Sequence, residues 1–145
     1  MVQFLKEFEQ VIHTCLWRKY ATFQGRADPK EFWLFILFLL LVNLAAGVFI
    51  SLIYLFSMFI AVIMPAAGLI VGGILMLIAV LALFSLFIPF LAVTARRLHD
   101  RDMSAWWLLL MLIPSFGVLA LFIICIFEGT DGANRFGDTA NITEL

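Results

Sequence analysis

The dominant pattern in the chain is an apolar stretch from Phe32 to Ala95, 64 residues without a single Asp, Glu, Lys, Arg or His. A helix that crosses the roughly 30 Å hydrocarbon core of a bilayer needs about 20 apolar residues. The stretch is therefore long enough for two membrane spans joined by a short turn. Pro65 and Gly68 favour a turn near its middle, so we predict span one over residues 29–63 and span two over residues 67–95.

Local signals mark the start of span one and a disturbance inside span two. Asp28 is a good helix cap, Pro29 suits the first helical position, and Glu31 stands three residues after the cap, as in a capping box. In span two, Pro89 removes one backbone donor and crowds the carbonyl of Ser85. The sequence therefore predicts a helix that begins at about Pro29 and a second helix that kinks near Pro89.

Gly68 and Gly72 form a GxxxG pair at the start of span two. Such a pair lets another helix approach closely, but it also arises often by chance in apolar segments. We favour packing within the monomer over a contact between two copies.

Residues 1–27 are predicted to form an amphipathic helix followed by a cytoplasmic loop. Apolar side chains recur there at helical spacing; they are Phe4, Leu5, Phe8, Val11, Ile12, Cys15 and Leu16. The helix suits two places, the headgroup layer of the membrane or a site against the protein's own spans. The sequence leaves both open.

A third apolar segment covers residues 105–127, long enough to span, and opens with Trp106 and Trp107, a pair typical of the membrane interface. Pro114 and Gly117 divide it into halves that each cover only half a bilayer. We favour a kinked full span, because a turn at mid-depth would expose unsatisfied backbone to lipid. The alternative is a re-entrant hairpin or a split into two, which would make the C-terminus cytoplasmic.

The basic residues predict the orientation. They precede span one or follow span two, and the turn between the spans has none, so the N-terminus and the basic loop 96–104 should be cytoplasmic. The polar tail 128–145 contains four acids and only Arg135, which favours the outside. The expected fold class is an all-α multi-pass membrane protein with an interfacial N-terminal helix and three transmembrane helices.

Composition supports one membrane domain over residues 1–145, since 65% of the residues are hydrophobic and only 13% are charged. Cys15 and Cys125 stand alone, and His99 has no second ligand at metal-binding spacing. We therefore expect no metal, cofactor, catalytic residue or nucleic-acid partner, and a protein that is not an enzyme.

The densest polar cluster in the sequence runs from Ala95 to Asp102. If span two continues through it as a helix, Arg96 and Asp100 stand four residues apart and can pair. Arginine also suits lipid phosphates. The simpler interpretation is that these cations hold the orientation of the spans and anchor the chain to headgroups.

Three blocks together resemble domain-of-unknown-function family 805, the YhaH-like proteins of the bacterial inner membrane. They are Phe23 to Ala27 leading into Glu31-Phe32-Trp33, then Ala95 to Asp100 followed by Trp106-Trp107, and Gly129 to Gly137. Ala105 and Glu128 depart from the family's pattern. The resemblance implies a small multi-pass protein of the cytoplasmic membrane without an established activity.

If the three blocks make one site, eight side chains should meet on one side of the membrane; they are Arg26, Glu31, Arg96, Arg97, His99, Asp100, Asn134 and Arg135. That meeting would require a cytoplasmic tail, against the charge-based expectation.

Two functions follow as hypotheses. The first is a non-enzymatic protein that binds anionic phospholipid headgroups or a membrane-protein partner through its cytoplasmic Arg-rich face. The alternative is a subunit of a small-solute transporter or channel, a homo-oligomer packed through Gly68 and Gly72. The path would be lined by the polar residues of the spans, which are Asn43, Ser51, Ser57 and Ser85.

Overall fold

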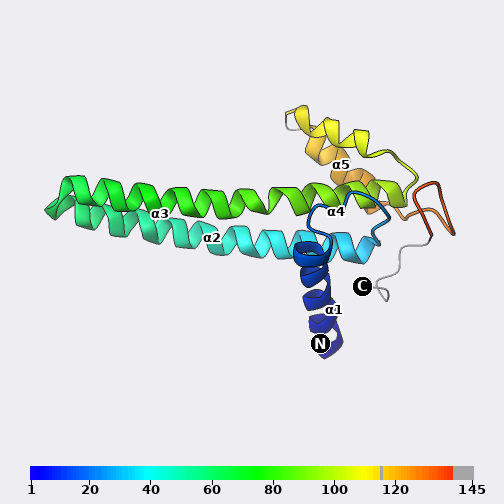
Figure 1. Ribbon diagram of the computed structural model, residues 1–145, viewed down its shortest axis with the longest axis horizontal. Coiled ribbons are helices and arrows are strands. Elements are labelled where there is room, and N and C mark those ends of the chain that lie inside the picture. Colours follow the sequence, from blue (N-terminus) through cyan, green and yellow to red (C-terminus); the bar gives the residue numbers. More distant parts are fainter. Residues whose placement is uncertain (115, 139–145) are drawn as a thin grey trace. The chain divides into compact units, whose positions relative to one another are not determined.

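The computed structural model describes residues 1–114 and 116–138 (Figure 1). The described residues are helical apart from loops and turns, and they divide into two compact units. Unit 1 contains residues 1–37 and 88–145, and unit 2 contains residues 38–87. Compactness alone does not show independent folding, so the single membrane domain over residues 1–145 stays a prediction. Residues 139–145 of the predicted tail lie outside the described part.

Seven helical elements follow one another along the described chain. They are α1 (Val2–His13), the π-helical turn η1 (Thr14–Arg18), α2 (Pro29–Ile63), α3 (Pro65–Ser85), α4 (Phe87–Asp100), the 3-10 helix η2 (Ala105–Leu112) and α5 (Phe116–Ile126). Among the described residues, Pro29–Ile63 and Pro65–Asp100 are long and apolar enough to cross a membrane. The helix α2 has the bounds predicted for span one, residues 29–63, and its crossing of a membrane stays a prediction.

The start of α2 uses only half of the predicted capping box. The Asp28 carboxylate accepts a hydrogen bond from the Lys30 N–H at 2.8 Å, so Asp28 does cap the helix. Glu31 does not complete the box, because its carboxylate binds Arg96 instead.

The second long helix is interrupted at Leu86, between α3 and α4. Pro89 lies three residues beyond the interruption and has no N–H to offer the Ser85 carbonyl, which gives a local reason for the break. Beyond it, α4 continues to Asp100. The basic loop predicted over residues 96–104 is therefore helical in its first half, because the buried partners of Arg96 and Arg97 hold the last turn in place.

Unit 2 is a helical hairpin that turns at Met64 and packs most tightly beside the turn. The Ser57 hydroxyl of α2 donates to the Gly68 carbonyl of α3 at 2.7 Å. A Cβ atom at Gly68 would lie 2.5 Å from the backbone nitrogen of Ala61, and one at Gly72 would overlap the Ser57 hydroxyl. The glycine pair thus lets the two helices of one chain touch, as predicted, and the two glycines are already occupied by that contact.

The predicted kinked helix over residues 105–127 is not formed. The segment consists of η2 and α5, two short helices that fold back on each other, so that a Cβ at Gly117 would overlap the Leu110 carbonyl. Backbone donors at the reversal are bonded locally, from Ile113 to Leu110 and from Gly117 to Ile113. Among the described residues of the reversal, the N–H groups of Ile113 and Gly117 therefore have backbone acceptors close by.

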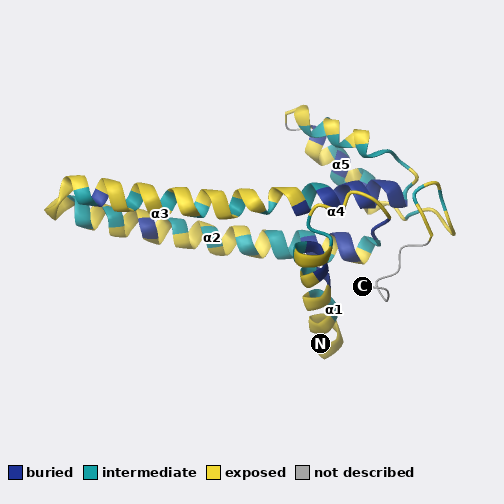
Figure 2. Ribbon diagram, viewed as in Figure 1, coloured by how far each residue is buried: buried dark blue, intermediate teal, exposed yellow. Residues whose placement is uncertain are grey.

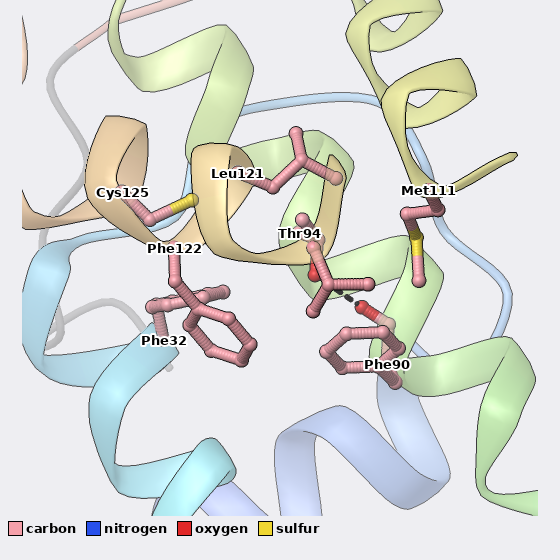
Figure 3. Close-up of a pocket in the computed structure, with 8 residues that line it drawn as sticks. Phe32, Phe90, Thr94, Met111, Leu121, Phe122 and Cys125 are labelled. Atoms are coloured by element: carbon pink, nitrogen blue, oxygen red, sulfur yellow. Dashed lines mark hydrogen bonds between the residues drawn. The ribbon is translucent and has the colours of Figure 1, made fainter. Parts of the chain in front are cut away.

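The core of unit 1 lies between α2, α4, η2 and α5, and Figure 2 shows that α4 is its most buried helix. Figure 3 shows the apolar centre, where Phe32, Phe90, Leu121 and Phe122 surround a cavity of about 10 Å³. A cavity of this size has room for about one water molecule. The Thr94 hydroxyl, a polar group that lines the cavity, already donates to the Phe90 carbonyl at 2.7 Å. The core is therefore closely packed and offers no ligand pocket here.

The first prediction concerns the glycine contact in unit 2. Replacing Gly68 with Ala should lower the free energy of unfolding by about 1–3 kcal/mol, the usual cost of overpacking, because the Cβ would meet the backbone of Ala61. Gly73→Ala is the matched control: its Cβ would meet no atom within 4 Å, and Ala is favoured over Gly in a helix by about 1 kcal/mol. Denaturant unfolding in mild detergent measures both, and equal stability of the two variants would contradict the packing described here.

Candidate functional site

A polar cluster in unit 1 unites the three blocks of the sequence. We use this name for Arg26, Glu31, Arg96, Arg97, His99 and Asp100, all buried, together with the tail residues bonded to them. Arg26 comes from the loop before α2, Glu31 from the first turn of α2, and the other four from the last five residues of α4. The tail contributes Thr130 and Asn134.

Asp100 is the centre of the polar cluster. Its carboxylate accepts a hydrogen bond from Arg26 Nε at 2.9 Å and another from Arg97 Nη1. Its backbone carbonyl accepts from the N–H of Thr130 at 2.9 Å and from the Thr130 hydroxyl at 3.1 Å. A Cβ at Gly129 would overlap the Asp100 carboxylate, so only glycine allows the tail to pass this closely. One residue at the end of α4 thus joins the loop before α2, its own helix and the tail.

Arg26 binds backbone carbonyls of the tail in addition to Asp100. Its Nη1 donates to the Gly132 carbonyl at 2.5 Å and its Nη2 to the Thr130 carbonyl at 2.7 Å. The backbone N–H of Ala27 donates to the Arg96 carbonyl at 3.0 Å, which ties the same loop to α4. Carbonyls of irregular backbone need donors wherever water is excluded, and the Arg26 guanidinium supplies two.

Arg97 and Arg101 bind the end of α5. Arg97 donates to the carbonyls of Cys125 at 3.3 Å and Phe127 at 2.6 Å, and Arg101 donates to the Ile124 carbonyl at 2.7 Å. The last carbonyls of a helix lack partners within it and form the negative end of its dipole. The two guanidinium groups donate hydrogen bonds to these carbonyls and place positive charge at the negative end of the dipole. The end of α5 is therefore held against α4.

Arg96 and Glu31 form a second buried ion pair, next to a thiol. Arg96 Nη1 binds a Glu31 carboxylate oxygen, and the Cys15 sulfur lies 3.7 Å from the same oxygen and 3.8 Å from Arg96 Nη2. Burial, reinforced by the negative charge of Glu31, raises the pKa of the Cys15 thiol to about 12. Cys15 is therefore a protonated donor at neutral pH. The pair anchors the C-terminal end of the N-terminal helical segment to α2 and α4.

His99 is covered by the tail. Its ring stacks on Phe136 with the centroids 3.9 Å apart, and its Nδ1 lies 3.2 Å from the Gly25 carbonyl. The Asn134 amide donates to the His99 carbonyl at 2.9 Å and to the Thr130 hydroxyl at 2.9 Å. These contacts leave His99 only 8% exposed.

Arg135 belongs to the rim of the polar cluster. It pairs with Asp102, and the side chains are 60% and 46% exposed. Its guanidinium also lies 4.8 Å from the centre of the Phe136 ring. An exposed pair of this kind contributes little to stability, which separates Arg135 from the buried arginines.

All eight residues singled out from the sequence come together in unit 1, but their partners differ from the expected ones. The Arg96–Asp100 pair that the helical spacing allows is not formed: Arg96 binds Glu31, and Asp100 binds Arg26 and Arg97. Several members were not predicted, namely Cys15, Arg101, Gly129, Thr130 and Phe136. For Cys15 the sequence did carry a signal, since it lies on the apolar stripe of the N-terminal helix.

The side chains of the polar cluster bind other groups of the same chain and hold its segments in place. Its three buried guanidinium groups face two carboxylates, backbone carbonyls and one thiol of the chain itself. Among the buried side-chain nitrogen and oxygen atoms of the described residues, only Arg96 Nε has no hydrogen-bond partner. No group of three His, Cys, Asp or Glu side chains suited to a metal ion occurs in residues 1–114 and 116–138. Of the arginines expected to meet lipid, Arg26, Arg96 and Arg97 are thus bonded inside the protein, and Arg135 is exposed.

The second prediction tests Asp100 as the centre of the cluster. Asp100→Asn keeps the shape but removes the charge that faces Arg26 and Arg97, so the free energy of unfolding should fall by about 3–5 kcal/mol, as for other broken buried pairs. Trypsin should then cleave faster at Arg135, because the tail loses its attachment.

Asp102→Asn is the control, because the Asp102 partner is exposed. Asp102 has a φ of 57°, a conformation that Asn tolerates, and the expected change is at most about 1 kcal/mol. Similar losses in the two variants would contradict the central role of Asp100.

Comparison with known proteins places this architecture. A family model described as "Protein of unknown function (DUF805)" matches residues 20–138. The inner membrane protein YhaI of Escherichia coli K12 is 37% identical over 121 residues, 83% of this chain and 87% of the relative. The inner membrane protein YhaH of the same strain is 38% identical over 120 residues, 83% of this chain and 88% of the relative. No solved structure matches. With more than half of its length matched by the family model and with relatives above 30% identity, the chain belongs to the DUF805 family of proteins of unknown function.

Proposed function

We propose that the chain is a multi-pass protein of the bacterial inner membrane, in which α2 and the run from α3 to α4 cross the bilayer as a hairpin. The printed names of YhaI and YhaH support this location. The N-terminus and the end of α4 lie on the cytoplasmic side, because the basic residues flank these ends and the turn at Met64 has none.

We propose further that η2 and α5 form a re-entrant hairpin and that the tail is cytoplasmic. The support is the bond from the Thr130 N–H to the Asp100 carbonyl, which brings the chain back to the residue at which α4 ends. An eleven-residue helix such as α5 rises only about 17 Å, roughly half of a bilayer core. The alternative is a third full span with the tail outside. It is favoured by the length of the segment and by the cost of exposing turn backbone to lipid, and by the acidic residues of the tail, which contribute little to orientation.

The activity we propose is non-enzymatic binding of anionic phospholipid headgroups at the cytoplasmic surface. The observation that carries it is the way α1 is held. Figure 1 shows α1 projecting away from α2, with only its C-terminal end beside the first turns of α2. Its C-terminal end is buried at Val11 and the following η1 at Cys15, while Val2, Phe4 and Leu5 of α1 are exposed. A helix fixed across the end of a membrane span lies along the interface, where exposed apolar and cationic side chains contact lipid.

The cations that contact headgroups in this proposal are those at the surface. Lys6 on α1 and Lys30 at the start of α2 are exposed, whereas Arg26, Arg96 and Arg97 are buried. The polar cluster acts through position, since the Cys15–Glu31–Arg96 contacts hold the N-terminal segment against α2 and α4. A membrane-protein partner that takes the place of lipid at this surface is the other outcome of the binding test.

The transporter alternative receives no support from the spans. Asn43 and Ser51 donate to carbonyls four residues earlier in α2, and Ser57 donates across the hairpin to Gly68. Gly68 and Gly72, the proposed contact between copies, are covered by α2 of the same chain. The polar groups expected to line a path are therefore occupied by backbone, and we do not propose transport.

The third prediction tests the topology. Cys15 and Cys125 are buried, so a membrane-impermeant thiol reagent should report an introduced cysteine. Ala133→Cys lies in the exposed part of the tail and Gln24→Cys in the exposed loop before α2. Both should react only after cell lysis. Labelling of Ala133→Cys but not of Gln24→Cys in intact cells would place the tail outside and overturn the re-entrant hairpin.

The fourth prediction tests headgroup binding by the full chain in mild detergent. Lys6→Gln and Lys30→Gln should each weaken the binding of short-chain phosphatidylglycerol by about 1 kcal/mol, roughly fivefold, and raised salt should weaken it in the wild type. Native mass spectrometry measures bound lipid, with Lys6→Arg and Lys30→Arg as charge-preserving controls. Lipid binding that ignores both charge and salt would refute the proposal; binding of a co-purified protein instead would point to the partner.

A further inference from the structure

Three segments of unit 1 meet at His99. The residue lies near the end of α4, beyond Ala95, where the apolar run of the sequence ends. Its Nδ1 lies 3.2 Å from the Gly25 carbonyl in the loop before α2. Its ring stacks on Phe136 of the tail, with the centroids 3.9 Å apart and the planes at 4°. The imidazole therefore connects the loop, the helix and the tail.

The contact with Gly25 defines the neutral form of the ring. A carbonyl oxygen can only accept a hydrogen bond, so Nδ1 of His99 carries the hydrogen and Nε2 carries the lone pair. A fall in pH adds the next proton to Nε2 and makes the ring a cation. The hydrogen bond to Gly25 exists in both forms, so the difference between them lies in the charges and the burial around the ring.

The surroundings of His99 already contain more buried positive than negative charge. Three buried guanidinium groups share two buried carboxylates. The ion pairs of the polar cluster and its rim are Arg26–Asp100, Arg97–Asp100, Arg96–Glu31 and Arg135–Asp102. None of these carboxylates is left over for a protonated His99, which would add one more positive charge to the surplus.

Two effects favour a charged ring at this position and two oppose it. The negative end of the α4 dipole and the face of the Phe136 ring each favour a cation by about 0.5–2 kcal/mol. Burial opposes the charge more strongly, since an ion without its own partner costs several kcal/mol, and Arg135 repels it. Burial, together with the charge of Arg135, lowers the pKa of His99, while the hydrogen bond to Gly25 reduces the shift.

We propose that His99 is a pH-sensitive latch for the tail, in which the neutral ring holds Phe136 and the protonated ring releases it. Release lets water reach the charged imidazole, which removes the cost of burying it. The hydrogen bonds from Thr130 to the Asp100 carbonyl do not involve the ring, so the released segment is residues 134–138. The latch is independent of headgroup binding.

The direction of the pH effect follows from the pKa. Because the pKa of His99 is lower with the tail attached than in a solvated imidazole, the attached state contributes its full stability above the ordinary imidazole pKa of about 6.5. This stability is lost as the pH falls below that value. Attachment of residues 134–138 should therefore weaken in mildly acidic solution.

Trypsin cleavage after Arg135 measures the release in the full chain in mild detergent. Mass spectrometry follows the fragment 136–145, and each rate is divided by that of an unstructured peptide at the same pH, which corrects for the protease itself. In the wild type the corrected rate should rise about threefold to tenfold from about pH 7.5 to about pH 5.5. His99→Gln cannot gain the charge and should show no rise, whatever its rate at neutral pH.

His13→Gln is the matched control, because His13 is the only other histidine of the chain and is exposed. It should keep the rise of the wild type. A corrected rate that does not change with pH in the wild type, or an equal rise in His99→Gln, would overturn the latch. Loss of the rise in His13→Gln would assign the effect to His13 and overturn it as well.

A measurement on His13→Gln keeps the test decisive if His99→Gln does not fold. In that protein His99 is the only histidine, so NMR of the labelled imidazole follows its protonation without ambiguity. The ring signals of Phe136 should shift with the same midpoint, because protonation and release are one event. Protonation of His99 that leaves the Phe136 signals unchanged would contradict the proposal.

Discussion

The shared carboxylate of Asp100 is the interaction on which the rest of unit 1 depends. It holds Arg26 and Arg97 at once, and each of these arginines then binds backbone carbonyls elsewhere, Arg26 in the tail and Arg97 at the end of α5. A buried cation is costly unless it is paired, and a buried carbonyl is costly unless it has a donor. Bonds between the arginines and the irregular backbone lower the free-energy cost of burying both, and Asp100 holds the arginines in the positions in which these bonds form.

What the sequence could predict was set by local signals. The start of α2 and the turn at Met64 followed from Asp28, Pro29 and the proline and glycine near the turn, because caps and turns depend on neighbours in the sequence. The partners of the polar cluster were predicted from the same local rules and came out wrong. The spacing of Arg96 and Asp100 fits an i,i+4 pair, and that of Asp28 and Glu31 fits a capping box. Glu31 instead binds Arg96, and Asp100 binds the distant Arg26 together with Arg97, three residues earlier. Long-range partners outweigh local pairs that contribute only tenths of a kcal/mol.

The structure of the third apolar segment also depends on distant contacts that a local sequence pattern does not reveal. Its length allowed a span, and Pro114 and Gly117 allowed a reversal; the decision between them lies outside the segment. Arg97 and Arg101 bind the last carbonyls of α5, and the Thr130 N–H binds Asp100, so the end of the segment returns to the end of α4. No pattern within residues 105–127 contains that information, although the density of arginine after span two was a visible sign that carbonyls nearby needed donors.

The two units are held together by different interactions. This difference indicates which unit has room for a ligand. Unit 1 is fixed by directional bonds, and its polar groups are almost all used by the chain itself, so a ligand would have to break a buried pair to enter. Unit 2 has no charges and is held at Ser57, Gly68 and Gly72 by close contact. Close contact requires small residues, and small residues that do not meet a partner leave space. The alanines between Phe38 and Leu86 are such residues, so the same choice of side chains that closes the hairpin beside Met64 leaves it open further along.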